Sequence, residues 1–295
     1  MQSLWMLMAA LLFAVIGVTI KLAAAAGYGT AELVFYRSVI GCMLATAAMA
    51  ALRIPIRTAH TAAHLKRGVA STVAISAFMY AVVHLPLSTA VTLNFTAPLW
   101  VALILALVFG ENLSRIMLVA LAVGFIGIVL LLQPVFTPDK RFDVTIGLLS
   151  GMAAAIGVLN VRRLGGLGEP DLRIFWWFTA IISMASGLWL VVVGGWKSHS
   201  LEGAGWVLAM AVAATAGQLA QTRAYSKGKA MLAANLSYAA VPFSALAGVL
   251  LYDDRIPVTG WLAMGMVILS GIMATWRTRR SETKALVPEP PTPST

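Results

Sequence analysis

Ten long apolar runs of about twenty residues each divide this chain, and they limit the folds available to it. A helix needs about 20 mostly apolar residues to cross roughly 30 Å of hydrocarbon. The runs predict membrane-spanning helices at 4–25, 31–51, 68–85, 89–109, 114–133, 145–163, 171–194, 204–222, 230–251 and 258–276. They are long and rich in Ala, Leu and Met, whereas a membrane β-barrel shows alternating segments of about ten residues. The predicted fold class is therefore an all-α integral membrane protein with ten transmembrane helices.

The balance of apolar and charged residues supports a lipid environment. Hydrophobic residues make up 60% of the 295 and charged residues only 11%. A soluble domain typically carries about 25% charged residues, so this chain has too few to cover a water-exposed surface. The net charge of +10 raises the alternative of a nucleic-acid binder, and the positions of the basic residues decide between the two.

The basic residues are distributed unevenly between the two sides of the predicted membrane domain. With the N-terminus in the cytoplasm, 15 of the 21 Lys and Arg residues fall in inner loops and the C-terminal tail. The outer loops hold four, namely Lys140, Arg141, Lys197 and Arg255. Because cytoplasmic loops are enriched in Lys and Arg, we expect a multi-pass cell inner membrane protein with both termini inside. Its basic segments face the lipid bilayer, and we expect no nucleic-acid partner.

An internal repeat relates the two halves of the chain. At an offset of 143 residues, Ala81 aligns with Ala224 and Leu93 with Leu236. The next helices each carry an early proline, Pro98 or Pro242. Five helices per unit is an odd number, so the second unit is inserted upside down, as in many secondary transporters. The sequence predicts two inverted five-helix repeats, residues 1–138 and 139–280, and a proline-rich, disordered cytoplasmic tail over 281–295.

Several short motifs occur in a characteristic order across the ten predicted helices. They are Gly17-Val-Thr-Ile-Lys21, Glu32-Leu-Val-Phe-Tyr36-Arg37, Asn94-Phe-Thr-Ala-Pro98, Gly110-Glu-Asn-Leu113, Gly124-Phe-Ile-Gly127, Gln221-Thr-Arg-Ala-Tyr225, Tyr238 and Asp253-Asp-Arg-Ile-Pro257. With these motifs the chain resembles the drug/metabolite transporter superfamily, in its ten-helix EamA-type branch, from Leu4 to Trp276. It differs at Phe13-Ala14, where many members have Trp-Gly. The resemblance implies a secondary carrier for an amino acid, a nucleotide-like or vitamin-like solute, or a drug, working by alternating access.

Two charged residues lie within the predicted spans, and charges inside hydrocarbon usually mark a transport pathway. Lys21 falls about 25 Å along the first span, so a lysine reaching the outer headgroups is the competing interpretation. Arg37 falls about 9 Å below the outer surface, where that interpretation explains it less well. Glu32 offsets at most one of the two charges. The pair predicts a preference for solutes with a carboxylate or phosphate, zwitterions included, over permanent cations.

Polar and aromatic side chains on other spans complete the candidate site. Pro98 leaves the carbonyl of Asn94 without its helical donor, which suits ligand binding. The predicted substrate-binding residues are Lys21, Tyr36, Arg37, Tyr80, Asn94, Thr96, Asn160, Gln218, Gln221, Asn235 and Tyr238. The competing interpretation of the uncharged polar groups is that they join helices to one another.

Other functional classes have less support in the sequence. It contains no HExxH or Gly-x-Ser-x-Gly motif, and we expect neither enzyme activity nor a metal or cofactor. A channel or a structural membrane protein remains the alternative function, and the working unit is a monomer or a homodimer. No Asp or Glu lies in the middle of a predicted span. This disfavours a carboxylate proton relay and favours uniport, exchange or coupling through the proton of the substrate itself.

Overall fold

The computed structural model describes residues 2–85, 87–133, 138–193, 201–252 and 257–286, and its regular elements in these ranges are all helices. The first half of the chain contains α1 (Gln2–Ala25), α2 (Thr30–Ala51), α3 (Thr61–His84), α4 (Leu87–Asn94), α5 (Ala97–Leu107) and α6 (Arg115–Leu132). The second half contains the short η1 (Pro138–Lys140), α7 (Arg141–Gly166), α8 (Asp171–Val193), α9 (Leu201–Lys227), α10 (Ala230–Ser237), α11 (Ala240–Tyr252) and α12 (Val258–Leu286).

The helices confirm the prediction of a multi-pass, all-helical membrane protein. Within the described residues, nine helical stretches are long and apolar enough to cross a membrane. The tenth predicted span corresponds to α3, which has 24 residues and so has sufficient length. It is not among the nine, because its first two turns carry His64, Lys66 and Arg67 ahead of the apolar stretch that starts at Gly68.

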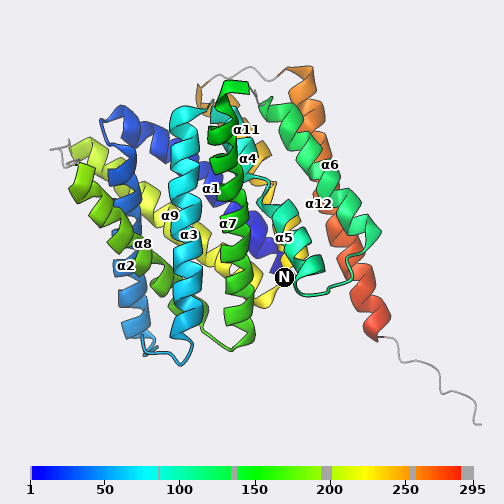
Figure 1. Ribbon diagram of the computed structural model, residues 1–295, viewed down its shortest axis with the longest axis horizontal. Coiled ribbons are helices and arrows are strands. Elements are labelled where there is room, and N and C mark those ends of the chain that lie inside the picture. The colour runs from blue at the N-terminus through cyan, green and yellow to red at the C-terminus, as the bar shows by residue number, and fades with distance from the viewer. Residues whose placement is uncertain (1, 86, 134–137, 194–200, 253–256, 287–295) are drawn as a thin grey trace, which may run out of the picture.

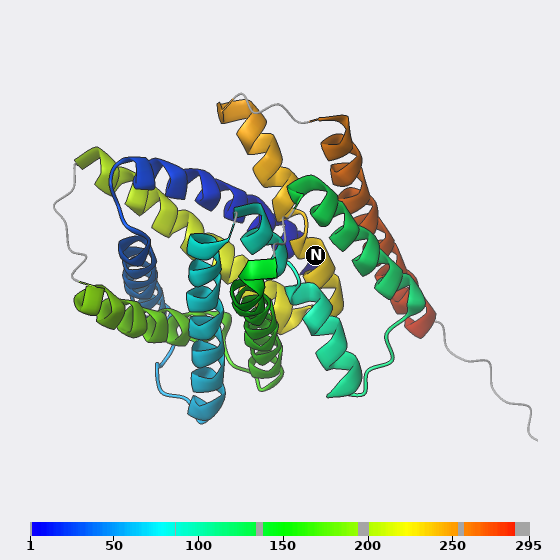
Figure 2. The same ribbon diagram turned by 45° about the horizontal axis from the view of Figure 1, so that its top comes forward.

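The long helices pack in pairs drawn from the two halves of the chain. α1 lies along α9, α3 along α7, α2 along α8, and α6 along α12. Both views place α2 and α8 at one side of the molecule and α6 and α12 at the other (Figures 1 and 2). The short helices α4, α5, α10 and α11 lie between these pairs, so the middle of the molecule is built from interrupted helices.

Several connections meet at one end of the molecule, which we call the basic end. It comprises the loops at 52–60, 108–114, 167–170 and 228–229. An ion pair of 2.6 Å joins Arg162, near the end of α7, to Glu111 in the loop after α5. Another, of 3.4 Å, joins Arg223, near the end of α9, to Asp171 at the start of α8. The basic end is the lower end in Figure 1.

The C-terminal helix reaches further than the sequence indicated. α12 continues to Leu286, six residues into the segment 281–295 that was expected to be disordered. The first proline of that segment is Pro288, so nothing before it interrupts helical hydrogen bonding. Residues 287–295 lie outside the described part of the chain.

Candidate functional site

The fourth predicted span is interrupted in its middle. The sequence suggested one helix over 89–109, but α4 ends at Asn94 and α5 begins at Ala97. Pro98 occupies the first turn of α5, where its missing N–H is not needed. Thr96 turns its hydroxyl back onto the carbonyl of Leu93 at 2.6 Å, which stabilises the end of α4. The continuous span is therefore corrected to two short helices.

The ninth predicted span is interrupted in the same way, exactly one repeat later along the chain. α10 ends at Ser237 and α11 begins at Ala240, so the residues between them are Tyr238 and Ala239. Pro242 lies in the first turn of α11, as Pro98 lies in that of α5. The two prolines were visible in the sequence, but a proline near a helix start is compatible with either one helix or two.

Glycines on α7 let the first interruption approach closely. A Cβ built on Gly151 would collide with Thr96 and lie 2.8 Å from the carbonyl oxygen of Leu93. A Cβ on Gly147 would lie 2.6 Å from the side chain of Leu93. The Gly147-x-x-x-Gly151 pattern thus packs helices within one chain. Asn94 adds a hydrogen bond from its amide to Ser150 Oγ of α7 at 3.2 Å.

The two interruptions meet in the middle of the molecule. The rings of Phe95 and Tyr238 lie 6.3 Å apart between centroids. Tyr238 is fully buried against Gly124 of α6, and its hydroxyl has no hydrogen-bond partner among the described residues. Asn235, one turn earlier, is buried against Leu121 of α6 and Ser270 of α12.

A cavity of about 200 Å³ lies beside both interruptions. Its polar lining comes from Asn94, Gln221, Tyr225 and Ser237, and its aromatic lining includes Phe13 and Phe95. None of its lining residues is charged. We call this the central cavity, because α1, α5, α7, α9 and α11 all contribute to it.

A second, much smaller cavity of about 10 Å³ lies between α2, α3, α8 and α9. Arg37 and Gln218 line it together with Ser38, Thr179 and Thr215. Within the described part of the chain, Arg37 forms no ion pair and no hydrogen bond through its side chain. We call this the Arg37 pocket.

One hydrogen bond connects the linings of these two cavities. Gln218 Nε2 donates to Gln221 Oε1 at 2.7 Å. The two glutamines are one turn apart on α9, so their side chains lie on the same face of the helix. Gln218 lines the Arg37 pocket and Gln221 lines the central cavity.

The remaining predicted residues lie away from the central cavity. Tyr80 donates to Asp143 Oδ1 at 3.0 Å, at the end of the molecule opposite the basic end. Tyr36 packs edge-on against Tyr28, with centroids 6.1 Å apart. Asn160 donates to the carbonyl of Ile156 on its own helix at 2.8 Å. Lys21 belongs to α1, but its side chain lies outside the described residues.

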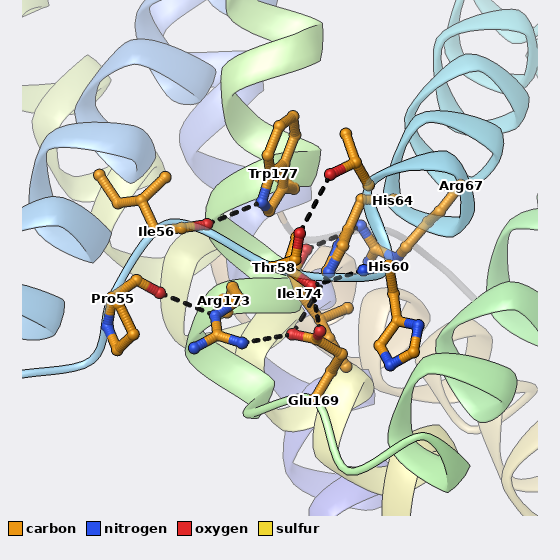
Figure 3. Close-up of polar contacts among 11 residues, drawn as sticks. Pro55, Ile56, Thr58, His60, His64, Arg67, Glu169, Arg173, Ile174 and Trp177 are labelled. Carbon is orange, nitrogen blue, oxygen red and sulfur yellow. Dashed lines mark hydrogen bonds and ion pairs between the residues drawn. The ribbon is translucent and has the colours of Figure 1, made fainter.

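A buried carboxylate at the basic end was not anticipated from the sequence. Glu169 is only 4% exposed, although it lies in the connection between α7 and α8. The Thr58 hydroxyl donates to Glu169 Oε1, and Arg173 donates to Oε2 at 2.9 Å. His64 Nε2 lies 3.4 Å from Oε2, within ion-pair distance but without hydrogen-bond geometry. Figure 3 shows these side chains converging from α3, α8 and the loop before α3.

Further contacts bind the same two loops together. Arg173 Nε donates to the carbonyl of Pro55 at 2.8 Å, and the ring of His64 stacks on Trp177 with centroids 5.6 Å apart. Arg67 lies over the ring of Phe178, 4.4 Å from its centroid. We call Thr58, His64, Arg67, Glu169 and Arg173 the basic-end cluster (Figure 3).

Burial and charge act in opposite directions within this cluster. Burial alone raises the pKa of Glu169, but the hydrogen bonds from Thr58 and Arg173 and the Arg173 charge outweigh it, so the pKa lies below its usual value. Burial lowers the pKa of His64, and the Glu169 carboxylate only partly offsets that effect. The ionised carboxylate and the neutral imidazole are therefore the favoured forms.

Comparison with known proteins places the chain among membrane transporters. Residues 1–133 match the model of the EamA-like transporter family. The chain is 28% identical over 275 residues to the pseudopaline exporter CntI of Pseudomonas aeruginosa, covering 92% of this chain and 95% of the relative. It is 26% identical over 289 residues to a riboflavin transporter of Vibrio cholerae, covering 95% and 94% of the two chains. A solved structure with 18% identity superimposes with a TM-score of 0.85 over 95% of this chain and 98% of the other.

Proposed function

Because the chain belongs to the EamA-type branch of the drug/metabolite transporters and carries a small metabolite across a membrane, we propose that it works by alternating access around the central cavity. In this mechanism the cavity opens to one side of the membrane at a time, as the two halves of the chain move against each other. The single observation that carries the proposal is the pair of helix interruptions that face this cavity.

An inverted repeat accounts for the arrangement of the helices. The interruption after Ser237 follows the interruption after Asn94 by 143 residues, the offset of the sequence repeat. A two-fold axis that exchanges the halves also exchanges the α1–α9 pair with the α3–α7 pair, and it relates α2 to α8 and α6 to α12. Equivalent residues touch only where such an axis passes, as Phe95 and Tyr238 do.

The lining of the central cavity indicates how a solute is held there. Interrupted helices at membrane depth leave backbone groups free to face a cavity. The side chains of Asn94, Gln221, Tyr225 and Ser237 supply further donors and acceptors. Phe13 and Phe95 offer ring faces to a planar group. Relatives named for pseudopaline and for riboflavin show that similar chains carry different solutes, so this lining is the part expected to set selectivity.

We further propose that the basic end faces the cytoplasm in a bacterial inner membrane. The excess of Lys and Arg in its loops supports this orientation. The basic-end cluster joins the loop before α3, in the first half, to the start of α8, in the second half. These contacts hold the cytoplasmic ends of the two halves together, so the conformation described here is the one closed to the cytoplasm.

The proposal is tested with purified protein and a library of metabolites. Solutes that raise the melting temperature are then assayed for saturable counterflow in proteoliposomes. Asn94→Ala and Gln221→Ala should each weaken binding at least tenfold, a loss of about 1.4 kcal/mol. Asn160→Ala is the matched control, because that amide bonds its own helix and does not line the cavity. Flux that does not saturate would favour a channel, and equal losses in all three variants would remove the cavity from the proposal.

A further inference from the structure

We propose that the Arg37 pocket is a subsite for the carboxylate or phosphate group of the transported solute. The neutral part of that solute occupies the central cavity next to it. This inference rests on the proposed function of the central cavity, and it adds the chemical class of the solute and a specific place for its charged group.

The first observation is a positive charge without a compensating partner. Arg37 lies seven residues after the start of α2, inside a stretch that crosses the membrane. Within the described residues no carboxylate pairs with it. A guanidinium in the membrane is costly unless an anion or water balances it, and its planar fork matches the two oxygens of a carboxylate.

The second observation is the surroundings of that charge. Ser38, Thr179, Thr215 and Gln218 line the same pocket, so neutral hydrogen-bonding groups are close to the guanidinium. The pocket measures about 10 Å³, roughly the space that one water molecule needs. A carboxylate is larger than one water molecule, and it therefore enters only if a lining side chain moves.

The third observation identifies that side chain. Gln218 lies between the pocket and the central cavity, and it is held by its hydrogen bond to Gln221. A solute in the central cavity competes for Gln221, which releases the Gln218 amide and lets an anionic group reach Arg37. Glutamine reorients readily, since its side chain has three rotatable bonds and both ends of its amide form hydrogen bonds.

These features define a class of solute with two ends. One end is an aromatic or polar uncharged body, which fits Phe13, Phe95, Asn94 and Gln221 in a cavity without charged residues. The other end is a carboxylate or phosphate, which fits Arg37. A permanent cation meets only the Arg37 charge in this part of the protein and is excluded.

Cysteine chemistry tests the pocket without knowledge of the solute. The only cysteine, Cys42, is first replaced in Cys42→Ser, and Gln218→Cys then places one thiol beside Arg37. In phosphatidylcholine nanodiscs, the thiol is reacted with an anionic and with a cationic methanethiosulfonate of similar size. The ratio of the anionic to the cationic rate should fall about tenfold when Arg37→Gln is added, equivalent to about 1.4 kcal/mol.

Controls separate the subsite from general charge effects and from lipid. Arg163→Gln removes an exposed arginine of α7 and should leave the rate ratio unchanged. A thiol that does not react, or a ratio that Arg37→Gln does not alter, overturns the subsite. Phosphatidylglycerol in the nanodiscs should also leave the rates unchanged. If it protects the thiol, the pocket holds a lipid headgroup, and the inference about the solute is wrong.

A second arm compares matched ligands by their effect on the melting temperature. Indole-3-acetate and indole-3-acetamide share an aromatic body and differ in charge. The carboxylate should stabilise the protein more than the amide, and Arg37→Gln should abolish that difference while Arg37→Lys retains part of it. Equal stabilisation by both ligands overturns the subsite and leaves the central cavity intact. Loss of all saturable flux and of all ligand stabilisation across the metabolite library would instead remove the proposed function.

Discussion

Phe95 and Tyr238 occupy equivalent positions in the two halves of this transporter, and their rings meet with centroids 6.3 Å apart. The Tyr238 hydroxyl is buried without a partner among the described residues. An unsatisfied buried hydroxyl is unfavourable, so Tyr238→Phe should leave stability unchanged or raise it by about 1 kcal/mol. Thermal denaturation measures this effect, and counterflow measures whether transport survives. A loss of solute affinity in the stable variant would show instead that the hydroxyl reaches the solute when the cavity is occupied.

The close contact between α7 and the first helix interruption gives a second prediction. Gly151→Ala adds a Cβ that collides with Thr96, so we expect a destabilisation of about 1–3 kcal/mol and a distorted central cavity. Gly205→Ala in α9 is the matched control, because a Cβ there meets nothing within 4 Å. That control should be neutral or stabilising by up to about 1 kcal/mol, since alanine favours a helix over glycine. Similar melting temperatures for the two variants would contradict the packing described here.

The basic-end cluster gives a third prediction, which compares two carboxylates at the same end of the molecule. Glu169→Gln leaves Arg173 with no carboxylate partner in a buried setting, and we expect a loss of about 3 kcal/mol. Glu111→Gln breaks a pair in which both side chains are more than a third exposed, and we expect a loss below about 1 kcal/mol. Denaturation of the two purified variants tests the difference. Glu169→Gln should also raise the rate at which thiols in the central cavity react from the cytoplasmic side.

The pKa of His64 predicts how stability responds to acid. Burial lowers this pKa in the folded protein, so the folded state binds the proton less readily than the unfolded state. The contribution is complete above about pH 6.5, the ordinary value for histidine, and is lost as the pH falls toward the folded value. Glu169, Arg67 and Arg173 are the charged groups that face the ring.

Melting temperatures at pH 7.5 and 5.0 test the assignment. The decrease on acidification should be smaller in His64→Gln than in the wild type. His84→Gln removes an exposed histidine at the opposite end of α3 and should show the full decrease. If the two variants respond alike, His64 is not the group responsible.

Orientation gives a fifth prediction. In a Cys42→Ser background, a thiol introduced by Lys140→Cys should react with an impermeant reagent in intact cells. A thiol introduced by Arg57→Cys should react only after the membrane is permeabilised, because Arg57 lies in a loop of the basic end. The reverse pattern would invert the proposed topology and place the basic-end cluster outside the cell.

Features that depend on local sequence were predictable here, whereas features that depend on distant contacts were not. Apolar length located the spans, and the Gly147-x-x-x-Gly151 pattern indicated close packing. The helix interruptions escaped detection because Pro98 and Pro242 are also compatible with continuous helices. Glu169 was read as an ordinary loop residue, since its burial depends on Thr58, a partner 111 residues away in the sequence.

The candidate site shows the same division. Asn94, Gln221 and Arg37 were selected as polar groups within spans, and they line the two cavities. Asn160 was selected on the same grounds, but its amide turns onto its own helix. Phe13 and Ser237 were missed as lining residues, because nothing in the residue types distinguishes them from others that face lipid or neighbouring helices.

An arginine seven residues into α2 also bears on how the chain enters the membrane during synthesis. A central arginine costs about 2.5–3.5 kcal/mol on insertion scales, whereas a leucine or phenylalanine contributes about −0.3 to −0.6 kcal/mol. The apolar residues that follow Arg37 up to Ala51 must therefore offset its cost. Arg37→Leu should make α2 insert more efficiently while it removes selection for anionic solutes. Biogenesis and selectivity thus place opposing demands on a single side chain.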